Sequence, residues 1–253
     1  MQRYFIDNKY INTENKTAFI EGKDYHHIRD VMRMKIGDNI ILQTNDLKEY
    51  LCEIIDLSKV VNLTIIEEKD NLNELNCHVT IAQGLVRREK TEEVVRRIVE
   101  LGASRYVNVK LERCNVQLKS KDDYKTSRLE TIVKEASEQS ERGKLLELDG
   151  YISFKEFLNY SKKYDFKFVA YENEGRTNSH NINDYLCNFP QKNILFLVGP
   201  EGGFSPNEIE MLEANGFICI GLGKRILRTE TAPLMIMSIV SAYVDYKGEK
   251  NED

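Results

Sequence analysis

The chain has 253 residues, of which 41% are hydrophobic, and its formal net charge is −5. This hydrophobic fraction excludes a largely disordered chain, and the length allows one or two domains. The first residues, MQRYFIDNKY, contain no apolar run flanked by positive charge, and no stretch reaches the roughly 18 apolar residues that a membrane span needs. These features predict a cytoplasmic protein that does not enter a membrane.

The cysteines and the charges argue against two further classes of site. The five cysteines are scattered without a CxxC pair, so neither a zinc site nor a disulfide framework is expected, and no metal is predicted. The negative net charge argues against nucleic-acid binding by bulk attraction, yet residues 84–145 carry more Lys and Arg than Asp and Glu. That stretch either faces phosphate or is a solvated helix surface with pairs such as Glu92 and Arg96.

Residues 1–70 are predicted to form a small β-rich domain. Strand-like runs at 39–43, 51–55 and 62–67 alternate with turn residues. One helix interrupts them, with Asp24 as its expected N-cap. The polar segment KDNLNELN, residues 69–76, has no periodicity and is predicted to be a linker, so a second domain is expected at 74–250.

From Cys77 onward, strand patterns alternate with helix patterns. The expected strands are 78–82, 106–109, 167–171, 194–198 and 217–220, and the expected helices are 91–101, 127–140, 206–214 and 232–246. Such alternation predicts an α/β domain with a mostly parallel sheet covered by helices. Ligands of such sheets bind beyond the carboxyl ends of the strands.

A glycine-rich loop, LVGPEGGFSPNE at 197–208, follows one of these strands. Its SPNE sequence predicts a capping box between Ser205 and Glu208, so a tight loop leads into a well-capped helix. The loop lacks the GxxxxGK[ST] and GxGxxG spacings, and Glu201 would repel a polyphosphate. A carboxylate among open backbone groups favours a ligand with hydroxyls or positive charge.

A second glycine loop, IGLGKRILRTETAP at 220–233, also follows a strand and leads into a helix, with Thr229 or Thr231 as the expected cap. Two such loops after two strands would form one pocket. The second loop would supply both apolar walls and convergent polar groups to it: Leu222, Ile226, Leu227, Arg228 and Glu230.

Taken together, GPEGGFSPNE and LGKRILRTETA resemble the two C-terminal motifs of the RsmE family, the 16S rRNA (uracil-N3) methyltransferases of the SPOUT class. The stretch VVRRIVELGASRYVNVKLERC resembles the ELG motif and following arginine of that family, and EASEQSERG resembles its EQ…R motif. At the N-terminus, RYF with HHIRDVMRMKIGD resembles the PUA-like segment of the family. The resemblance spans nearly the whole chain, although Arg97 stands where a lysine is common and residues 145–190 show no motif.

The resemblance implies a SPOUT-type mostly parallel sheet with a C-terminal trefoil knot, preceded by a PUA-like β-barrel domain. It further implies a homodimer that uses S-adenosyl-L-methionine to methylate N3 of a uridine in 16S rRNA of the small ribosomal subunit. The expected cofactor-binding residues are Leu197, Gly199, Glu201, Gly202, Gly203, Leu222, Gly223, Ile226, Leu227, Arg228 and Thr231. The helix 232–246 is apolar nearly all round, which is typical of a core helix or of a dimer interface.

Methyl transfer to N3 requires stabilisation of the negative charge that spreads onto O2 and O4, and Arg228 is the expected group for this task. Glu230 would orient Arg228, accept the proton or act as a first-turn helix carboxylate, and His27 and His180 are alternative bases. The residues expected to contact RNA are basic: Arg3, Arg29, Arg33, Lys35, Arg87, Arg88 and Arg142.

Three other functions compete with this one. A SPOUT methyltransferase acting on tRNA or on another base would keep both glycine loops. A pure RNA-binding or assembly factor would keep the basic surface without needing Arg228 and Glu230 beside a cofactor pocket. A nucleotide hydrolase would need a lysine and a magnesium site, which the glycine loops do not offer.

Overall fold

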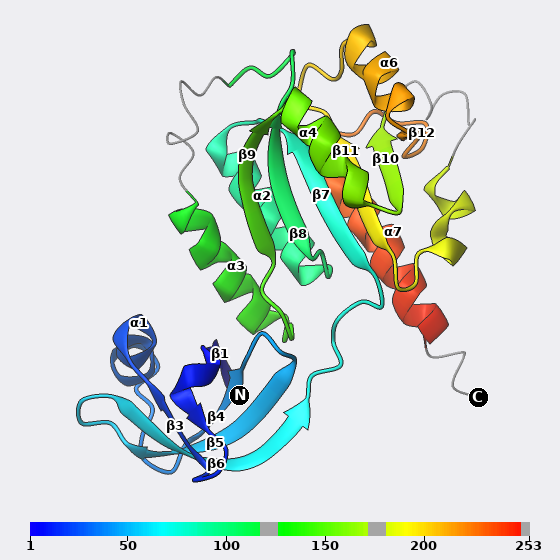
Figure 1. The fold of residues 1–253 in the computed structure, drawn as a ribbon. Coiled ribbons are helices and arrows are strands. Elements are labelled where there is room, and N and C mark those ends of the chain that lie inside the picture. The colour runs from blue at the N-terminus through cyan, green and yellow to red at the C-terminus, as the bar shows by residue number, and fades with distance from the viewer. Residues whose placement is uncertain (117–125, 172–180, 249–253) are drawn as a thin grey trace. The chain divides into compact units, whose positions relative to one another are not determined.

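The computed structural model describes residues 1–116, 126–171 and 181–248, which divide into two compact units (Figure 1). The first unit comprises Met1–Glu74 together with Ser137–Leu145. The second comprises Leu75–Ala136 and the chain from Leu146 onward. Of the residues singled out in the sequence, His180 lies outside the described ranges.

A six-stranded sheet in the order β1-β4-β5-β6-β3-β2 forms the first unit. Its strands are β1 (Gln2–Phe5), β2 (Ile11–Asn12), β3 (Thr17–Ile20), β4 (Asn39–Gln43), β5 (Lys48–Asp56) and β6 (Val61–Asp70). Only the β1–β4 pair is parallel. Alternate residues point into the core, where Ile40, Leu42, Cys52 and Ile54 are fully buried. The strands predicted in this region are therefore confirmed within β4, β5 and β6.

One local prediction for the first unit is wrong. The helix α1 (Gly22–His26) continues as a π-helical turn over His27–Val31, and its N-cap is Glu21 without a side-chain hydrogen bond. Asp24 lies in the first turn and does not cap it. The polar segment 69–76 contains the boundary between the two units, between Glu74 and Leu75. Its first residues are structured, because β6 runs to Asp70 and Asn71 is buried.

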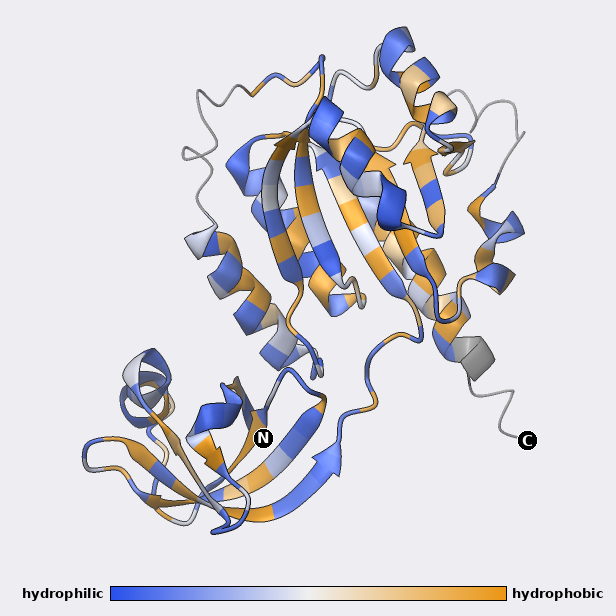
Figure 2. Ribbon diagram, viewed as in Figure 1, coloured by the Kyte–Doolittle hydropathy of each residue, from blue (hydrophilic) through white to orange (hydrophobic). Residues whose placement is uncertain are grey.

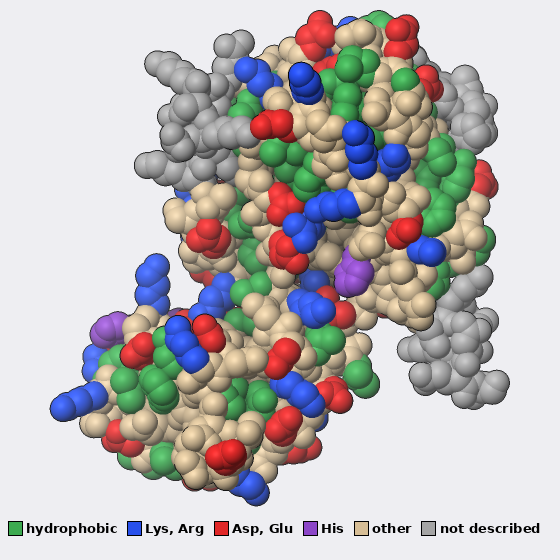
Figure 3. Space-filling model, viewed as in Figure 1, with side chains coloured by type: hydrophobic (Ala, Val, Ile, Leu, Met, Phe, Trp, Pro, Cys, Tyr) green, Lys and Arg blue, Asp and Glu red, His purple; other side chains and the backbone are tan. Residues whose placement is uncertain are grey.

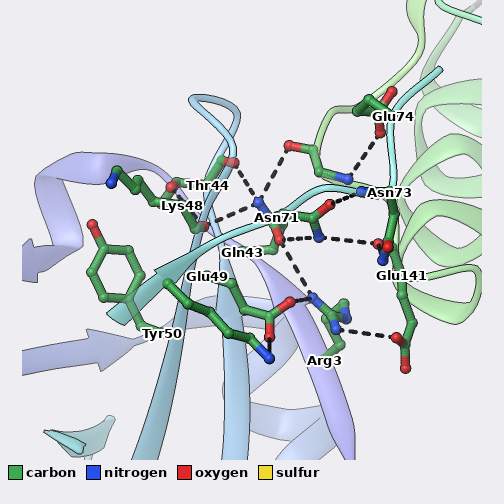
Figure 4. A network of polar contacts seen from close by, with 12 residues as sticks. Arg3, Gln43, Thr44, Lys48, Glu49, Tyr50, Asn71, Asn73, Glu74 and Glu141 are labelled. Atoms are coloured by element: carbon green, nitrogen blue, oxygen red, sulfur yellow. Dashed lines mark hydrogen bonds and ion pairs between the residues drawn. The ribbon is translucent and has the colours of Figure 1, made fainter. Parts of the chain in front are cut away.

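Residues 71–74 are fixed by partners far away in the sequence, in β4 and in residues 137–145. The Asn71 side chain donates to Gln43 Oε1 at 2.9 Å and to the Glu141 carbonyl at 3.1 Å (Figure 4). The Glu74 carboxylate accepts from Arg142 Nε and from its terminal nitrogen, each at 2.7 Å. The segment that joins the two units is therefore held by tertiary hydrogen bonds on its N-terminal side, which polar composition alone did not indicate.

The second unit contains a six-stranded sheet in the order β12-β10-β11-β7-β8-β9, in which every neighbouring pair is parallel. Its strands are β7 (His78–Gly84), β8 (Arg105–Lys110), β9 (Glu147–Ser153), β10 (Phe166–Ala170), β11 (Asn193–Val198) and β12 (Ile218–Ile220). The predicted parallel sheet is confirmed. The pattern missed β9, in the region without a motif.

Helices cover both faces of the second sheet (Figure 1). They are α2 (Arg88–Glu100), α3 (Ser127–Gln139), α4 (Phe154–Tyr160), α6 (Pro206–Ala214) and α7 (Thr231–Gly248). Helices α2 and α7 contact each other on one face, and α4 and α6 pack on the other, against strand residues such as Val107 and Leu197. Figure 2 shows the apolar residues concentrated on the strands and on α7, as the burial of a parallel sheet on both faces requires.

The order of the strands creates a switch point between β7 and β11. From β7 the chain builds outward to β8 and β9, and from β11 it is flanked by β10 and then β12. Loops that leave adjacent strands in opposite directions open a crevice beyond the carboxyl ends of those strands. The two glycine loops follow β11 and β12, and α2 begins shortly after β7, so all three segments reach the same edge of the sheet.

Candidate functional site

The first glycine loop connects β11 to α6. Gly203 has φ +66°, which favours glycine, and a Cβ on Gly202 would lie 2.9 Å from the backbone oxygen of Arg113. The predicted capping box is confirmed, with Ser205 as the N-cap and Glu208 accepting from the Ser205 N–H at 2.9 Å. Glu208 also accepts from the Glu112 N–H at 2.8 Å, which ties the loop after β8 to the glycine loop.

The second glycine loop, residues 221–230, connects β12 to α7. Its Thr229 side chain is buried, and the hydroxyl donates to the Gly199 carbonyl of the first loop at 2.7 Å. Thr231, the other residue predicted as a cap, is the first residue of α7. A direct hydrogen bond therefore holds the two glycine loops together.

A network of hydrogen-bonded, buried polar side chains on β7 and β8 holds Thr229 in place. The Gln83 amide donates to the Thr229 carbonyl at 2.9 Å and to its hydroxyl at 3.1 Å. Gln83 in turn accepts from the Tyr106 hydroxyl at 2.8 Å, which accepts from Asn108 at 3.0 Å. Gln83 and Asn108 are fully buried. A buried polar group that lacks a hydrogen-bond partner is costly, so this network favours one arrangement of the two glycine loops.

The two loops enclose a cavity of about 620 Å³, within the range of small-molecule sites. Residues 198–204 and 222–230 line it from the two loops. The remaining lining residues come from four other segments of the second unit: Lys90, Arg113, Ala170, Tyr171 and Ala232. The prediction that both glycine loops form one pocket is therefore confirmed.

Lys90, in the first turn of α2, joins the carboxylates of both loops. Its Nζ lies 3.1 Å from Glu201 Oε1 and 3.1 Å from Glu230 Oε2. The Glu201 carboxylate, and after it that of Glu230, raises the pKa of Lys90 above its ordinary value. Burial acts to raise the pKa of Glu230, but hydrogen bonds from its own backbone N–H and from Lys90 outweigh burial and lower it. The net shift of each pKa keeps Lys90 and Glu230 charged at neutral pH.

Arg228 lies at the mouth of the cavity with its side chain 85% exposed. Its terminal nitrogen is 3.9 Å from Glu230 Oε1, while its carbonyl accepts from the backbone N–H groups of Thr231 and Ala232 at the start of α7. The backbone of Arg228 is thus fixed and its guanidinium is free to approach a ligand. Arg113, which also lines the cavity, donates to the Gly202 carbonyl at 3.3 Å.

Most residues expected to bind a cofactor line this one cavity: Gly199, Glu201, Gly202, Gly203, Leu222, Gly223, Ile226, Leu227 and Arg228. Leu197 does not line it, because its side chain is fully buried in the sheet core. Thr231 does not line it either and is exposed on α7. Closeness to the glycines in the sequence does not distinguish the residues that line the cavity from their sequence neighbours.

The basic residues expected to contact RNA fall into two groups. Arg29, Arg33 and Lys35 are exposed on the first unit, and Arg87 and Arg88 are exposed at the start of α2 on the second. On the face drawn in Figure 3, Lys and Arg side chains lie among Asp and Glu, without a continuous basic patch.

Arg3 and Arg142 form the second group and are buried, at 7% and 3% exposure. Arg3 forms an ion pair with Glu49 (Figure 4), and Arg142 forms one with Glu74. Both guanidiniums are therefore paired with carboxylates of the first unit and expose little surface for a phosphate contact. Sequence alone does not tell an exposed arginine from a buried, paired one.

Several residues of the site were not expected from the sequence. Lys90, Phe204 and Tyr171 line the cavity, but none of them was among the predicted site residues. The same holds for Gln83, which holds the second loop through Thr229. The available signal for Lys90 was its place in the first turn of the helix that follows β7. This position becomes informative only when β7 is known to lie next to β11.

The described residues contain no group of three or more His, Cys, Asp or Glu side chains that would hold a metal ion. None of the helices in this same part of the chain has the length and hydropathy required to cross a bilayer.

Known proteins match both units. Residues 73–241 match the RNA methyltransferase domain family, and residues 20–60 match the RNA methyltransferase PUA domain family. The chain is 37% identical to a Bacillus subtilis protein named ribosomal RNA small subunit methyltransferase E, covering 95% of this chain and 96% of that protein. It is 32% identical to the Synechocystis protein of the same name, covering 90% and 74%.

A solved structure agrees with this result. The ribosomal RNA small subunit methyltransferase E of Neisseria gonorrhoeae, bound to S-adenosyl methionine, superimposes with a TM-score of 0.83 at 27% identity, covering 96% of this chain and 97% of that one. The first family match spans all the residues that line the cavity, and the second spans β4 and β5 of the N-terminal sheet. The chain belongs to the RNA methyltransferase family that includes the ribosomal RNA small subunit methyltransferases E.

Proposed function

We propose that this chain uses S-adenosylmethionine to methylate N3 of a specific uridine in 16S rRNA of the small ribosomal subunit. The observation that carries the proposal is the single cavity of about 620 Å³ between the two glycine loops, in a chain whose relatives are named for methylation of that RNA. The neighbour from Neisseria gonorrhoeae supports the identity of the cofactor.

The lining of the cavity fits this cofactor group by group. Glu201 and Glu230 suit the positive charges of the sulfonium and amino groups and the ribose hydroxyls. Leu222, Ile226 and Leu227 offer an apolar slot for adenine. The open backbone at Gly203 lets a ligand approach closely. When bound, the cofactor supplies an activated methyl group for in-line displacement by N3.

In the proposed reaction the methyl group moves from sulfur to N3, the carbon–sulfur electron pair stays on sulfur, and the N3 proton passes to solvent water. Arg228 stabilises the negative charge that spreads onto O2 and O4, because its guanidinium is exposed at the cavity mouth. Glu230, 3.9 Å away, orients that guanidinium. Its lowered pKa makes Glu230 a weak base, which favours the orienting role over proton abstraction.

The RNA contacts that we propose are the exposed basic residues Arg29, Arg33, Lys35, Arg87 and Arg88. They would offset the few kcal/mol that unstacking a uridine costs. Replacing any of these residues by Ala should reduce the salt dependence of RNA binding. Binding that changed little between low and high salt would contradict the assignment.

The protein is further proposed to be a cytoplasmic homodimer with a trefoil knot around the glycine loops. Support for the dimer comes from α7, whose buried residues Ile236 and Val240 face the unit while Leu234, Met235 and Ile239 remain half-buried. A helix that is apolar on more than one side is typical of an interface.

The test combines binding with product mapping. S-adenosylmethionine should raise the melting temperature of the purified chain, whereas ATP should not. Small subunits from a strain lacking the enzyme should then gain N3-methyluridine, and Arg228→Ala should abolish this gain while Arg225→Ala, at the same cavity, retains most of it. Methylation of tRNA instead of the subunit would establish the competing SPOUT activity, and no response to the cofactor would refute the proposal.

A further inference from the structure

Three charged groups from separate segments meet at one edge of the cavity. Lys90 comes from α2, Glu201 from the first glycine loop and Glu230 from the second, and the lysine nitrogen is 3.1 Å from an oxygen of each carboxylate. Their side chains are 31%, 31% and 15% exposed. The cluster therefore carries one net negative charge in a partly desolvated place, where charge is felt more strongly than in bulk water.

The negative charge of this cluster should affect the binding of the donor and the binding of the product of the proposed reaction differently. S-adenosylmethionine carries a positive sulfur, whereas the sulfur of S-adenosylhomocysteine is neutral, and the two molecules otherwise share their charged and apolar groups. The ratio of their dissociation constants thus reports the electrostatic potential at the sulfur position. A potential set by two carboxylates alone would favour the donor strongly.

We propose that Lys90 sets the preference of this cavity for the sulfonium donor over the thioether product by neutralising one of the two carboxylate charges. The inference rests on the proposed function. Neutralisation by Lys90 would favour the reaction, because the positive charge on sulfur declines on the way to the transition state. An unbalanced pair of carboxylates would stabilise the bound donor more than the transition state, and this would slow methyl transfer.

The experiment measures the dissociation constants of S-adenosylmethionine and S-adenosylhomocysteine by calorimetry for the wild type, Lys90→Met and Lys90→Arg. Loss of the lysine charge should move the ratio toward the donor by about tenfold, the scale expected for one charge several ångströms away in a partly exposed site. Lys90→Arg should keep the ratio within about twofold of the wild type, because the charge remains. Turnover of Lys90→Met should fall while its apparent KM for the donor also falls.

The matched control is Lys224→Met, which removes the same charge from the same cavity. Lys224 is exposed, and the described residues show no carboxylate within ion-pair distance of it, so its removal should leave the ratio nearly unchanged. Adding Glu201→Gln to Lys90→Met restores the charge balance and should bring the ratio back. If Lys90→Met fails to fold, Glu201→Gln alone still tests the idea, because it should move the ratio away from the donor.

An equal loss of affinity for donor and product in Lys90→Met would overturn the proposal, since it would show a purely structural lysine. An equal shift of the ratio in Lys224→Met would overturn it as well, since any charge near the cavity would then suffice. Failure of the wild type to bind either molecule would instead refute the proposed function.

Discussion

Replacing Tyr106 by Phe tests whether the buried polar chain under the glycine loops organises the cavity. The substitution removes the hydroxyl that donates to Gln83 Oε1 at 2.8 Å and leaves the ring in place. Gln83 is fully buried, so its carbonyl oxygen loses its donor in a place that water does not reach. Such an unsatisfied group costs about 1–3 kcal/mol, which should appear as a lower free energy of unfolding.

The loss should also reach the cofactor. Gln83 holds Thr229 through both the carbonyl and the hydroxyl, and that hydroxyl holds Gly199. When Gln83 turns to find another donor, the loops lose their fixed spacing, and the cofactor must then order them on binding. We expect the dissociation constant for S-adenosylmethionine to rise about tenfold, or about 1.4 kcal/mol.

The matched control is Tyr164→Phe, in a second polar cluster of the same sheet. The Tyr164 hydroxyl bonds to Thr80 Oγ1 at 3.0 Å and to the Tyr160 hydroxyl at 2.8 Å, and Thr80 lies on β7 as Gln83 does. This variant should lose stability but bind the cofactor normally. Urea unfolding measures the stability of both variants, and calorimetry measures their affinity for S-adenosylmethionine. An unchanged affinity for this cofactor in Tyr106→Phe would refute the reasoning.

Three further predictions concern single ionisable groups. Glu208→Ala removes the capping box of α6 and an acceptor for a second loop, so it should lower the free energy of unfolding by about 1–3 kcal/mol in a urea titration. The pKa of Glu230 is lowered in the folded protein, so its ion pair with Lys90 stabilises the fold above its ordinary pKa of 4.5 and is lost as the pH falls through the lowered value. The difference in melting temperature between wild type and Glu230→Gln should therefore shrink on acidification, and a difference that does not depend on pH would contradict this. Arg142→Met leaves Glu74 without its bidentate partner and should destabilise the first unit by about 3–5 kcal/mol, while a loss below about 1 kcal/mol would show that the pair is unimportant.

The features that the sequence predicted correctly are those that depend on neighbours along the chain. A capping box needs only Ser205 and Glu208, three positions apart, and a left-handed turn needs only a glycine such as Gly203. The alternation of strands and helices likewise arises from local periodicity, and it predicted a parallel sheet. The joint cavity followed, because loops after parallel strands meet at one edge.

The features that the sequence did not predict depend on which strands are neighbours. Gln83 belongs to β7, and Lys90 follows that strand in the sequence. Strand β7 lies beside β11 only because the strand order reverses there. The hydrophobic periodicity of the sequence does not show which strands are neighbours in the sheet. Arg3 was expected at the surface for the same reason, since its partner Glu49 is on a strand two positions away in the sheet and out of reach of any local pattern.

The position of the cavity explains why its walls can be so open. Glycine loops alone are poorly ordered, because glycine loses more conformational freedom on folding than any other residue. Here each loop is fixed at a few points by groups outside it: Gln83 from β7, Glu112 from the segment after β8 and Lys90 from α2. The order therefore comes from the buried edge of the sheet, and the backbone between those points remains uncovered for a ligand. Removing one of these outside groups should consequently impair binding more than changing an exposed loop residue such as Lys224.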